Sequence, residues 1–142
     1  MEKVQVFLDS DVVVASLLSP KGAAYEVINR SVVQKFISKG IVEEVTTVAL
    51  RLSIPKAQVD KVFGKLEVLP LIGKKSEVLK QYGKFVKDPE DSHVIAAANF
   101  ALVRFLLTFN LRHYKVDVIK DKLGILVITP GFFLQYLRSL KS

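Results

Sequence analysis

Two carboxylates follow a short apolar run near the start of the chain. Residues 4–8 are rich in Val, Phe and Leu, which predicts a strand buried on both faces. Asp9 and Asp11 come directly after it, with Ser10 between them. Ligands of open α/β sheets bind in the crevice outside the carboxyl ends of the strands, so we expect both acids there. The alternative is that Asp11 or Ser10 merely caps the next helix, which we expect to start near Val12, but capping does not account for both acids. The pair therefore predicts a cation site.

Two later acids could join this cation site from predicted helices. Glu44 immediately precedes Val45, which helical spacing places on the buried side of its helix. Adjacent helical residues point about 100° apart, so Glu44 can face the crevice more easily than Glu43, which we expect at the surface. Asp91 lies one turn into an Ala-rich helix, where its carboxylate could point over the strand ends. The alternative for Asp91 is a purely structural interaction with the N-terminus of the helix dipole.

Two polar residues follow a second apolar strand. Thr108 could donate a hydrogen bond to a carboxylate or to a phosphate. Asn110 offers an amide oxygen that could ligate Mg²⁺ or order a water on the ion, although it brings no charge. Asn is also common in turns, so a structural role for Asn110 stays open.

We expect the other acidic residues and the two histidines considered for the site to have structural or surface roles. Asp88 precedes a Pro and fits the N-cap of a helix. His93 and His113 have no partner at metal-ligand spacing, and we expect them to be structural or surface residues. Asp117 and Asp121 lie in a polar connection and are expected to face water. The sequence has no Ser-His-Asp set, P-loop or Gly-rich dinucleotide fingerprint.

Apolar strands and amphipathic helices alternate along the chain and must position these groups. No hairpin turn signal separates the strands, which favours parallel connections through helices. We therefore predict a three-layer α/β/α fold, with a mostly parallel central sheet of about four to five strands and helices on both faces. Leu52, Leu79 and Phe132 are among the residues expected on buried helix faces. The expected strands are residues 4–8, 32–37, 68–71, 104–108 and 125–128, and the expected helices are residues 12–18, 23–31, 39–53, 56–66, 76–86, a helix that includes 93–98, and 130–140.

Composition limits the class of protein. The chain has 142 residues, of which 50% are hydrophobic; this fits one domain over residues 1–142 and argues against disorder. Cys is absent, which excludes disulfides, thiolate metal sites and Cys nucleophiles. Neither a signal peptide nor an apolar run of ~20 residues is visible, so we expect a cytoplasmic protein. Lys and Arg number 21 against 14 acids, and the net charge of +7 would attract a polyanion.

The order of these motifs resembles the PIN-domain family of metal-dependent ribonucleases. The resemblance covers nearly the full chain. It depends on the order and the separations of several motifs taken together, and not on any single motif. The pieces are Val6-Phe7-Leu8-Asp9 before a short helix, Glu43-Glu44-Val45 in a middle helix, Asp88-Pro89-Glu90-Asp91 opening an Ala-rich helix, residues 107–112 (LTFNLR) and residues 124–130 (GILVITP).

The resemblance implies an endoribonuclease whose acids hold Mg²⁺ or Mn²⁺. Carried over to this sequence, the ligands are Asp9, Glu44 and Asp91, with Asn110 in a fourth place that is often acidic. Clustered carboxylates repel one another unless a cation offsets their charge, and hard oxygen ligands suit these two ions. The ion would lower the pKa of a water and align it with a phosphodiester, leaving a 5′-phosphate and a 3′-hydroxyl.

Two departures from the family pattern bear on this site. Asn110 replaces the fourth acid, which puts a second metal ion in question more than the first. Asp11 stands where the family often has Asn, Ser or Thr, and as a further ligand it could restore part of the missing charge. A reduced set of acids would make a weak nuclease.

The resemblance also implies partners. RNA is the expected substrate, with Lys21, Lys39, Arg112 and Lys115 as phosphate contacts chosen from their positions. Many family members are VapC-like toxins silenced by an antitoxin that covers the site, so an antitoxin is an expected partner; RNA processing is the alternative role. A homodimer is a further expectation, because apolar residues such as Phe132 could line a dimer face as easily as the core.

Two other interpretations stay open at this point. A PIN-like fold could bind RNA or a protein without cutting, and the loss of an acid at Asn110 is its main support. Residues 9–13 also fit the opening motif of haloacid-dehalogenase-type phosphatases, with Asp9 as the nucleophile and Thr108 in the second motif. The later order argues against the phosphatase, because Asp91 comes before Thr108 rather than after it.

Overall fold

Five parallel strands form one central sheet in the computed structural model, which describes residues 3–140. The order of the strands is β3-β2-β1-β4-β5, and every neighbouring pair is parallel. The predicted sheet, with its five strands, is therefore confirmed. The strands are β1 (Val4–Leu8), β2 (Val33–Ser38), β3 (Glu67–Leu69), β4 (Phe105–Leu107) and β5 (Leu126–Ile128).

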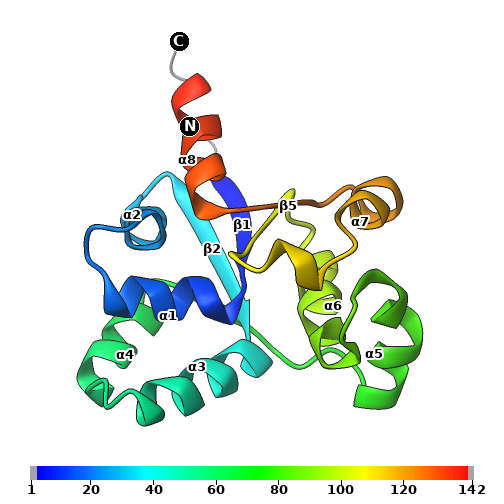
Figure 1. Ribbon diagram of the computed structural model, residues 1–142, viewed down its shortest axis with the longest axis horizontal. Coiled ribbons are helices and arrows are strands. Elements are labelled where there is room, and N and C mark those ends of the chain that lie inside the picture. The colour runs from blue at the N-terminus through cyan, green and yellow to red at the C-terminus, as the bar shows by residue number, and fades with distance from the viewer. Residues whose placement is uncertain (1–2, 141–142) are drawn as a thin grey trace.

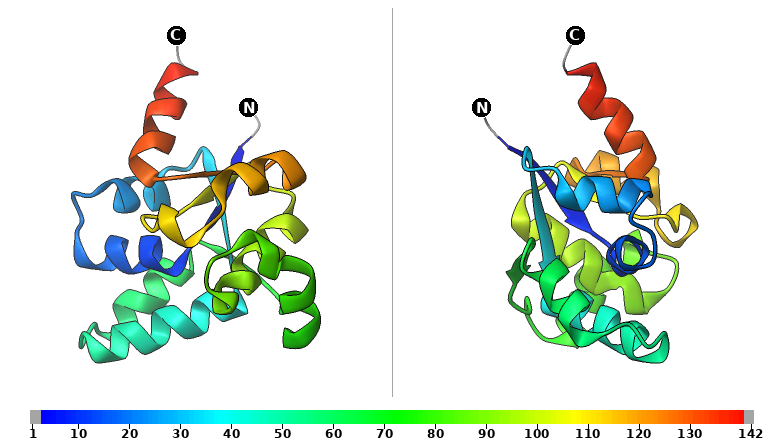
Figure 2. Two further views of the ribbon diagram at one scale, coloured as in Figure 1. Left: turned by 45° about the vertical axis from the view of Figure 1, so that its right-hand side comes forward. Right: turned by 90° about the vertical axis from the view of Figure 1, so that its left-hand side faces the viewer.

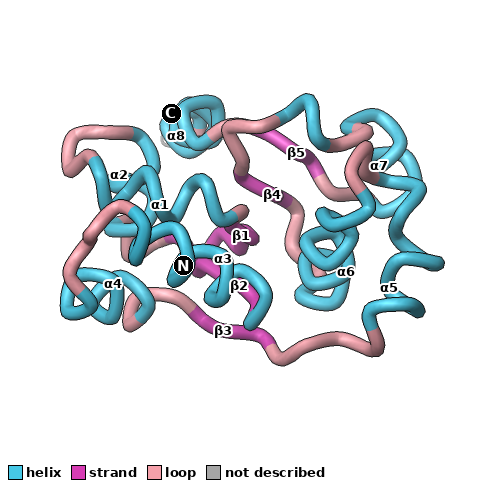
Figure 3. Tube along the Cα trace, turned by 60° about the horizontal axis from the view of Figure 1, so that its bottom comes forward, coloured by secondary structure: helices cyan, strands magenta, loops and turns pink. Residues whose placement is uncertain are grey.

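Helices cover both faces of the sheet, as predicted. Figure 3 shows α1 to α4 and α8 on one side of the strands and α5 to α7 on the other, and Figure 1 shows the same arrangement from another direction. The helices are α1 (Ser10–Leu18), α2 (Ala23–Asn29), α3 (Lys39–Arg51), α4 (Lys56–Phe63), α5 (Lys75–Tyr82), α6 (Ser92–Ala101), α7 (Val116–Leu123) and α8 (Pro130–Ser139), with short 3₁₀ turns η1 (Gly83–Phe85), η2 (Pro89–Asp91) and η3 (Leu111–His113). Within residues 3–140, no helix is both long enough and apolar enough to cross a membrane.

The direction in which the strands are added reverses beside β1. The chain leaves β1 to form β2 and β3 on one side, and later crosses back to form β4 and β5 on the other. Such a switch point opens a crevice at the carboxyl ends of the two central strands. Leu8 pairs with Leu107 there, and the Asp9 amide donates to the Leu107 carbonyl at 3.0 Å. This register places Asp9 beside Thr108, although 98 residues separate them in the chain.

β1 forms the centre of the core. Val6, Phe7 and Leu8 are completely buried, because helices pack on both faces of this strand. At the far end of the chain, Phe133 of α8 packs its ring against Phe105 of β4, with the ring centroids 5.3 Å apart. The apolar run that predicted a doubly covered strand therefore lies where the sheet is most deeply enclosed.

One helix was missed by the sequence analysis. Residues 116–123 form α7, although they were interpreted as a polar connection. Val116, Ile119 and Leu123 share one face at helical spacing and pack on the core, so the amphipathic signal was present, but the charged residues between them were given more weight. Asp117 and Asp121 do face water, as expected.

Three apolar residues predicted to be buried are exposed instead. Leu52 is 50% exposed because it caps the C-terminal end of α3 and lies beyond its packed turns. Leu79 of α5 is 42% exposed and lines a groove that has α3 on one side and α5 and α6 on the other. Phe132 is 63% exposed, since its neighbour Phe133 takes the inward direction in α8. Figure 2 shows that α8 extends away from the body of the molecule, which leaves its outer side open.

The end of α6 offers a test of local backbone strain. Leu102 caps this helix in the left-handed region, with φ of 57°, and its side chain is 83% exposed. A Cβ is disfavoured in that conformation and Gly is not, so Leu102→Gly should raise the free energy of unfolding by about 1 kcal/mol. Denaturant unfolding followed by circular dichroism measures this change.

The matched control is Leu50→Gly, which makes the same change at an exposed residue inside α3. There the helical backbone should make Gly destabilising by about 1 kcal/mol. Equal signs for the two substitutions would contradict the assignment of strain to Leu102.

Candidate functional site

Asp9 ends β1 and is held by three hydrogen-bond donors. Its Oδ1 accepts from the Ser10 amide at 2.9 Å, so Asp9, and not Asp11 or Ser10 as considered from the sequence, caps α1. Its Oδ2 accepts from the Thr108 hydroxyl at 3.0 Å and from the Tyr114 hydroxyl at 2.7 Å. An ionised carboxylate can accept about four hydrogen bonds, so Oδ1 keeps room for one more ligand. With only 8% of Asp9 exposed, the two hydroxyls fix the direction of the carboxylate.

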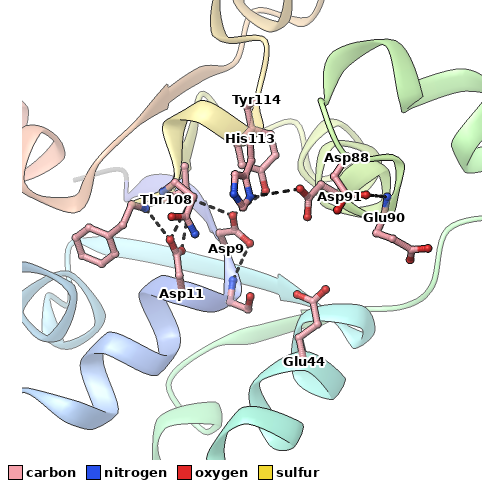
Figure 4. A network of polar contacts seen from close by, with 12 residues as sticks. Asp9, Asp11, Glu44, Asp88, Glu90, Asp91, Thr108, His113 and Tyr114 are labelled. Atoms are coloured by element: carbon pink, nitrogen blue, oxygen red, sulfur yellow. Dashed lines mark hydrogen bonds and ion pairs between the residues drawn. The ribbon is translucent and has the colours of Figure 1, made fainter.

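Asp11 lies in the first turn of α1, beside Asp9. Its Oδ2 accepts from the Phe109 amide at 2.9 Å and lies 3.3 Å from the Thr108 hydroxyl. The Thr108 hydroxyl has a single proton, and Asp9 is its nearer acceptor. Burial, followed by repulsion from Asp9, raises the pKa of Asp11 from 3.8 to about 6. Figure 4 shows both carboxylates on the same side of the Thr108 segment.

Asp91 reaches the site from the start of α6. It is the last residue of η2 and stands at the N-cap position, rather than one turn into the helix as expected. Its side chain makes no capping hydrogen bond, whereas Asp88 accepts from the Glu90 amide and fulfils the predicted capping role. Burial raises the pKa of Asp91, and repulsion from Asp9 adds to this effect. His113 Nδ1 lies 3.5 Å from Asp91 Oδ2.

Glu44 reaches the site from α3 and pairs with His93 of α6. The distance from His93 Nε2 to Glu44 Oε2 is 3.0 Å, and Nε2 is the donor because an ionised carboxylate only accepts. Burial alone would raise the pKa of Glu44, but the hydrogen bond and charge of His93 lower it below its usual value. Burial alone would lower the pKa of His93, but Glu44 raises it. The two groups therefore stabilise each other's charged forms.

The remaining predicted residues lie at different distances from this cluster of acids. Asn110 follows Thr108, but its side chain is exposed and makes no hydrogen bond within residues 3–140. Lys39 begins α3 just beyond the carboxyl end of β2, while Arg112 lies in η3 and Lys115 directly precedes α7; all three are exposed. Lys21 is different, because it lies in the loop at the far end of α1 from the acids.

Three residues of the site were missed as functional candidates by the sequence analysis. Tyr114 was not considered, and His93 and His113 were assigned structural or surface roles. Each meets a carboxylate partner that is distant in the chain, as with Tyr114 and Asp9, which are 105 positions apart. No spacing rule within one element could reveal such pairs. The one local signal was that polar residues surround the predicted strand end at Thr108.

The acids of four segments thus surround one region at the carboxyl ends of β1 and β4. Figure 4 shows Asp9, Asp11, Glu44 and Asp91 directed toward it from different elements. Their mutual repulsion contributes to the raised pKa values of Asp11 and Asp91. Within residues 3–140, no three His, Cys, Asp or Glu side chains lie close enough together to hold a metal ion as they stand. The arrangement is a concentrated negative charge built from hard oxygen donors.

The comparisons with known proteins identify the fold and the family. A family model described as the PIN domain matches residues 5–112, which is most of the chain. The chain belongs to the PIN domain family. The match includes the four acids and favours this family over the phosphatase family considered from residues 9–13. No curated protein matches the chain.

Solved structures share this fold at low sequence identity. A toxin–antitoxin complex from Klebsiella pneumoniae aligns with a TM-score of 0.65 and 17% identity, over 88% of this chain and 97% of that one. VapBC2 from Rickettsia felis, bound to a DNA fragment from its promoter, aligns with a TM-score of 0.58 and 13% identity, over 87% and 97% of the two chains. PAE2754 from Pyrobaculum aerophilum aligns with a TM-score of 0.62 and 16% identity, over 96% and 90%.

The crowding of carboxylates predicts that Asp11→Asn stabilises the metal-free protein. Because the pKa of Asp11 is higher in the folded protein than in the unfolded chain, stability is lost as the pH rises from 3.8 to about 6 and stays lost above it. An Asn oxygen can still accept from the Phe109 amide. In EDTA at pH 7.5, the substitution should raise the free energy of unfolding by about 1 kcal/mol. The gain should shrink as the pH is lowered toward 4.

Thermal and denaturant unfolding at the two pH values measure this effect. Asp121→Asn, at an exposed acid of α7, is the control and should change stability little. A loss of stability in Asp11→Asn at pH 7.5 would contradict the account, because it would show that burial and repulsion from Asp9 do not outweigh the hydrogen bonds that the Asp11 carboxylate accepts.

Proposed function

We propose that the protein is an endoribonuclease that depends on Mg²⁺ or Mn²⁺. The observation that carries this proposal is the meeting of Asp9, Glu44 and Asp91 at the switch point of the sheet, in a chain of the PIN domain family. These are the acids that the family pattern marks as metal ligands. The net charge of +7 supports a polyanionic substrate, because a basic protein attracts the phosphates of a nucleic acid.

The donor chemistry of the site fits a hard divalent cation. Asp9, Glu44 and Asp91 would hold the ion, with Asp11 as a further ligand and Asn110 in the fourth place. Carboxylate oxygens are the ligands that Mg²⁺ and Mn²⁺ prefer, and a cation would relieve the repulsion that raises the pKa values of two of these acids. Since the acids lie too far apart to hold an ion as they stand, binding would draw them together. When bound, the ion would activate water and stabilise charge on the phosphodiester.

The protein's own residues would prepare the site for this chemistry. Thr108 and Tyr114 occupy Oδ2 of Asp9, which leaves Oδ1 as the oxygen with free capacity. Cleavage would leave a 5′-phosphate and a 3′-hydroxyl. Asn110 adds an oxygen but no charge, so a single ion and a modest rate are the expectation.

Basic residues around the acids would hold the RNA backbone. Lys39, Arg112 and Lys115 are exposed and belong to segments next to the carboxyl ends of the strands. Their charges would offset the acids and attract phosphates on either side of the cleaved bond. Lys21 lies at the far end of α1, so its contact would be to a distant part of the strand or to none.

The toxin of a toxin–antitoxin pair is the proposed biological role. Its support is that two proteins of the same fold are described as toxin–antitoxin assemblies. An antitoxin would then be the physiological partner and would cover the acids. Such a toxin would act on RNA in the cytoplasm, and the absence of Cys is compatible with that reducing compartment.

Cleavage of RNA should require both the metal and the acids. We expect a labelled single-stranded RNA of mixed sequence to be cut in Mn²⁺ or Mg²⁺ and to stay intact in EDTA. Asp9→Asn and Asp91→Asn should each reduce the rate at least about 100-fold, because loss of a ligand should cost more than loss of a residue that supports one. Gel analysis of products, with end-group mapping, measures the rate and the chemistry.

Asp121→Asn is the control. It changes an exposed acid of α7 that is not one of the four site acids, and this variant should cut RNA like the wild type. RNA that is bound but intact in every condition would overturn the enzyme proposal, and a binding module that has lost its acid at Asn110 would take its place.

Expression in a bacterial host tests the toxin role separately. The wild type should arrest growth, and Asp9→Asn at the same protein level should not, because only cleavage of cellular RNA would be toxic. Normal growth with a wild-type protein that cuts RNA in vitro would instead favour RNA processing.

A further inference from the structure

Two residues of α3 face the same side chain of α6. Gly40 and Glu44 are four residues apart in α3, so they lie on one face of the helix, one turn apart. His93, in the first turn of α6, meets both of them. Its Nε2 lies 3.0 Å from Glu44 Oε2, while its Nδ1 faces the backbone at Gly40. The imidazole thus joins the two helices at the point where Glu44 enters the site.

Gly40 makes room for the His93 ring. A Cβ built on Gly40 would lie 2.8 Å from Nδ1 and 3.1 Å from Cε1 of His93, closer than side chains pack. The absence of a side chain at Gly40 therefore lets the ring lie against α3, where it can reach Glu44. Any larger residue at this position would push the ring away from its partner.

His93 keeps this position at an energetic cost. Its Nδ1 is buried and has no hydrogen-bond partner within residues 3–140. A buried polar atom without a partner is unfavourable, and an apolar residue would pack two helices together without that cost. In this position, however, His93 Nε2 is a fixed hydrogen-bond donor to Oε2 of Glu44.

We propose that His93, seated against Gly40, is a positioning residue that orders the Glu44 carboxylate for metal binding. The inference rests on the proposed function, because it assigns His93 a task toward the same ion. Glu44 has three side-chain torsions and is 42% exposed, so without a partner it would sample many directions. His93 holds Oε2 at 3.0 Å, and a smaller contribution to the order of the carboxylate comes from a hydrogen bond with the Ser10 side chain. Residues that orient ligands in this way commonly change metal affinity 10- to 100-fold when they are removed.

The first test is the affinity for Mn²⁺ alone, measured by calorimetry and by the electron paramagnetic resonance of free Mn²⁺. His93→Leu keeps the apolar contact with α3 but removes the donor, and should weaken binding about 10-fold. Gly40→Ala should weaken it similarly, because it displaces the ring without changing either partner. His93→Gln, which can still donate from its amide, should retain most of the affinity. Glu43→Gln, at the exposed neighbouring acid, is the control and should bind like the wild type.

A double-mutant cycle separates positioning from a general packing role. In a Glu44→Gln background, His93→Leu should weaken Mn²⁺ binding no further, because its effect acts through Glu44. A 10-fold loss in both backgrounds would overturn the proposal, and so would unchanged affinity in His93→Leu.

A second test measures how ordered the Glu44 side chain is in the metal-free protein, and therefore does not depend on nuclease activity. Carbon-13 relaxation of the Glu44 side chain should show greater mobility in His93→Leu and in Gly40→Ala than in the wild type. If the wild type binds no Mn²⁺, the proposed function fails, and the relaxation of Glu44 alone decides whether His93 orders it. Equal mobility in all three proteins would overturn the positioning role.

Discussion

Repulsion among carboxylates is the constraint on which the site depends. Four acids approach one region, and two of them, Asp11 and Asp91, have raised pKa values because burial and neighbouring negative charge oppose their ionisation. A fold tolerates such crowding only when donors hold each acid. Here the donors are the Thr108 and Tyr114 hydroxyls on Asp9, the Phe109 amide on Asp11 and the His93 imidazole on Glu44. The charge that remains is what a divalent cation would neutralise.

The sheet supplies the rigid part of this arrangement. β1 is buried on both faces, and its pairing of Leu8 with Leu107 fixes where Asp9 and the Thr108 segment emerge. The other two acids come from α3 and from the turn before α6, which lie on opposite sides of the sheet. Their side chains are therefore positioned by contacts between helices, of which the His93–Glu44 pair is the main polar one. This division explains why Asp9 is fully constrained while Glu44 needs a partner of its own.

Much of the fold could be predicted from sequence, because its signals are local. The strand at residues 4–8 and the capping role of Asp88 depend only on residues that are neighbours in the sequence. The alternation of strands and helices predicted the parallel sheet. The helix α7 was missed although Val116, Ile119 and Leu123 have helical spacing, because the segment is only eight residues long and half of it is charged. The hydrogen-bond partners of the acids could not be predicted from the sequence either. Tyr114 reaches Asp9 only because two strands lie side by side, and that pairing is a property of the folded sheet.

The most direct test of the central claim is a crystal structure of the protein soaked with Mn²⁺, recorded at a wavelength where manganese scatters anomalously. The account predicts one anomalous peak bound by the carboxylates of Asp9, Glu44 and Asp91, with the acids drawn closer together than in the metal-free protein. A structure in which Mn²⁺ binds elsewhere, or leaves these carboxylates as they are at millimolar concentration, would contradict the claim that the acids form a metal-dependent catalytic site.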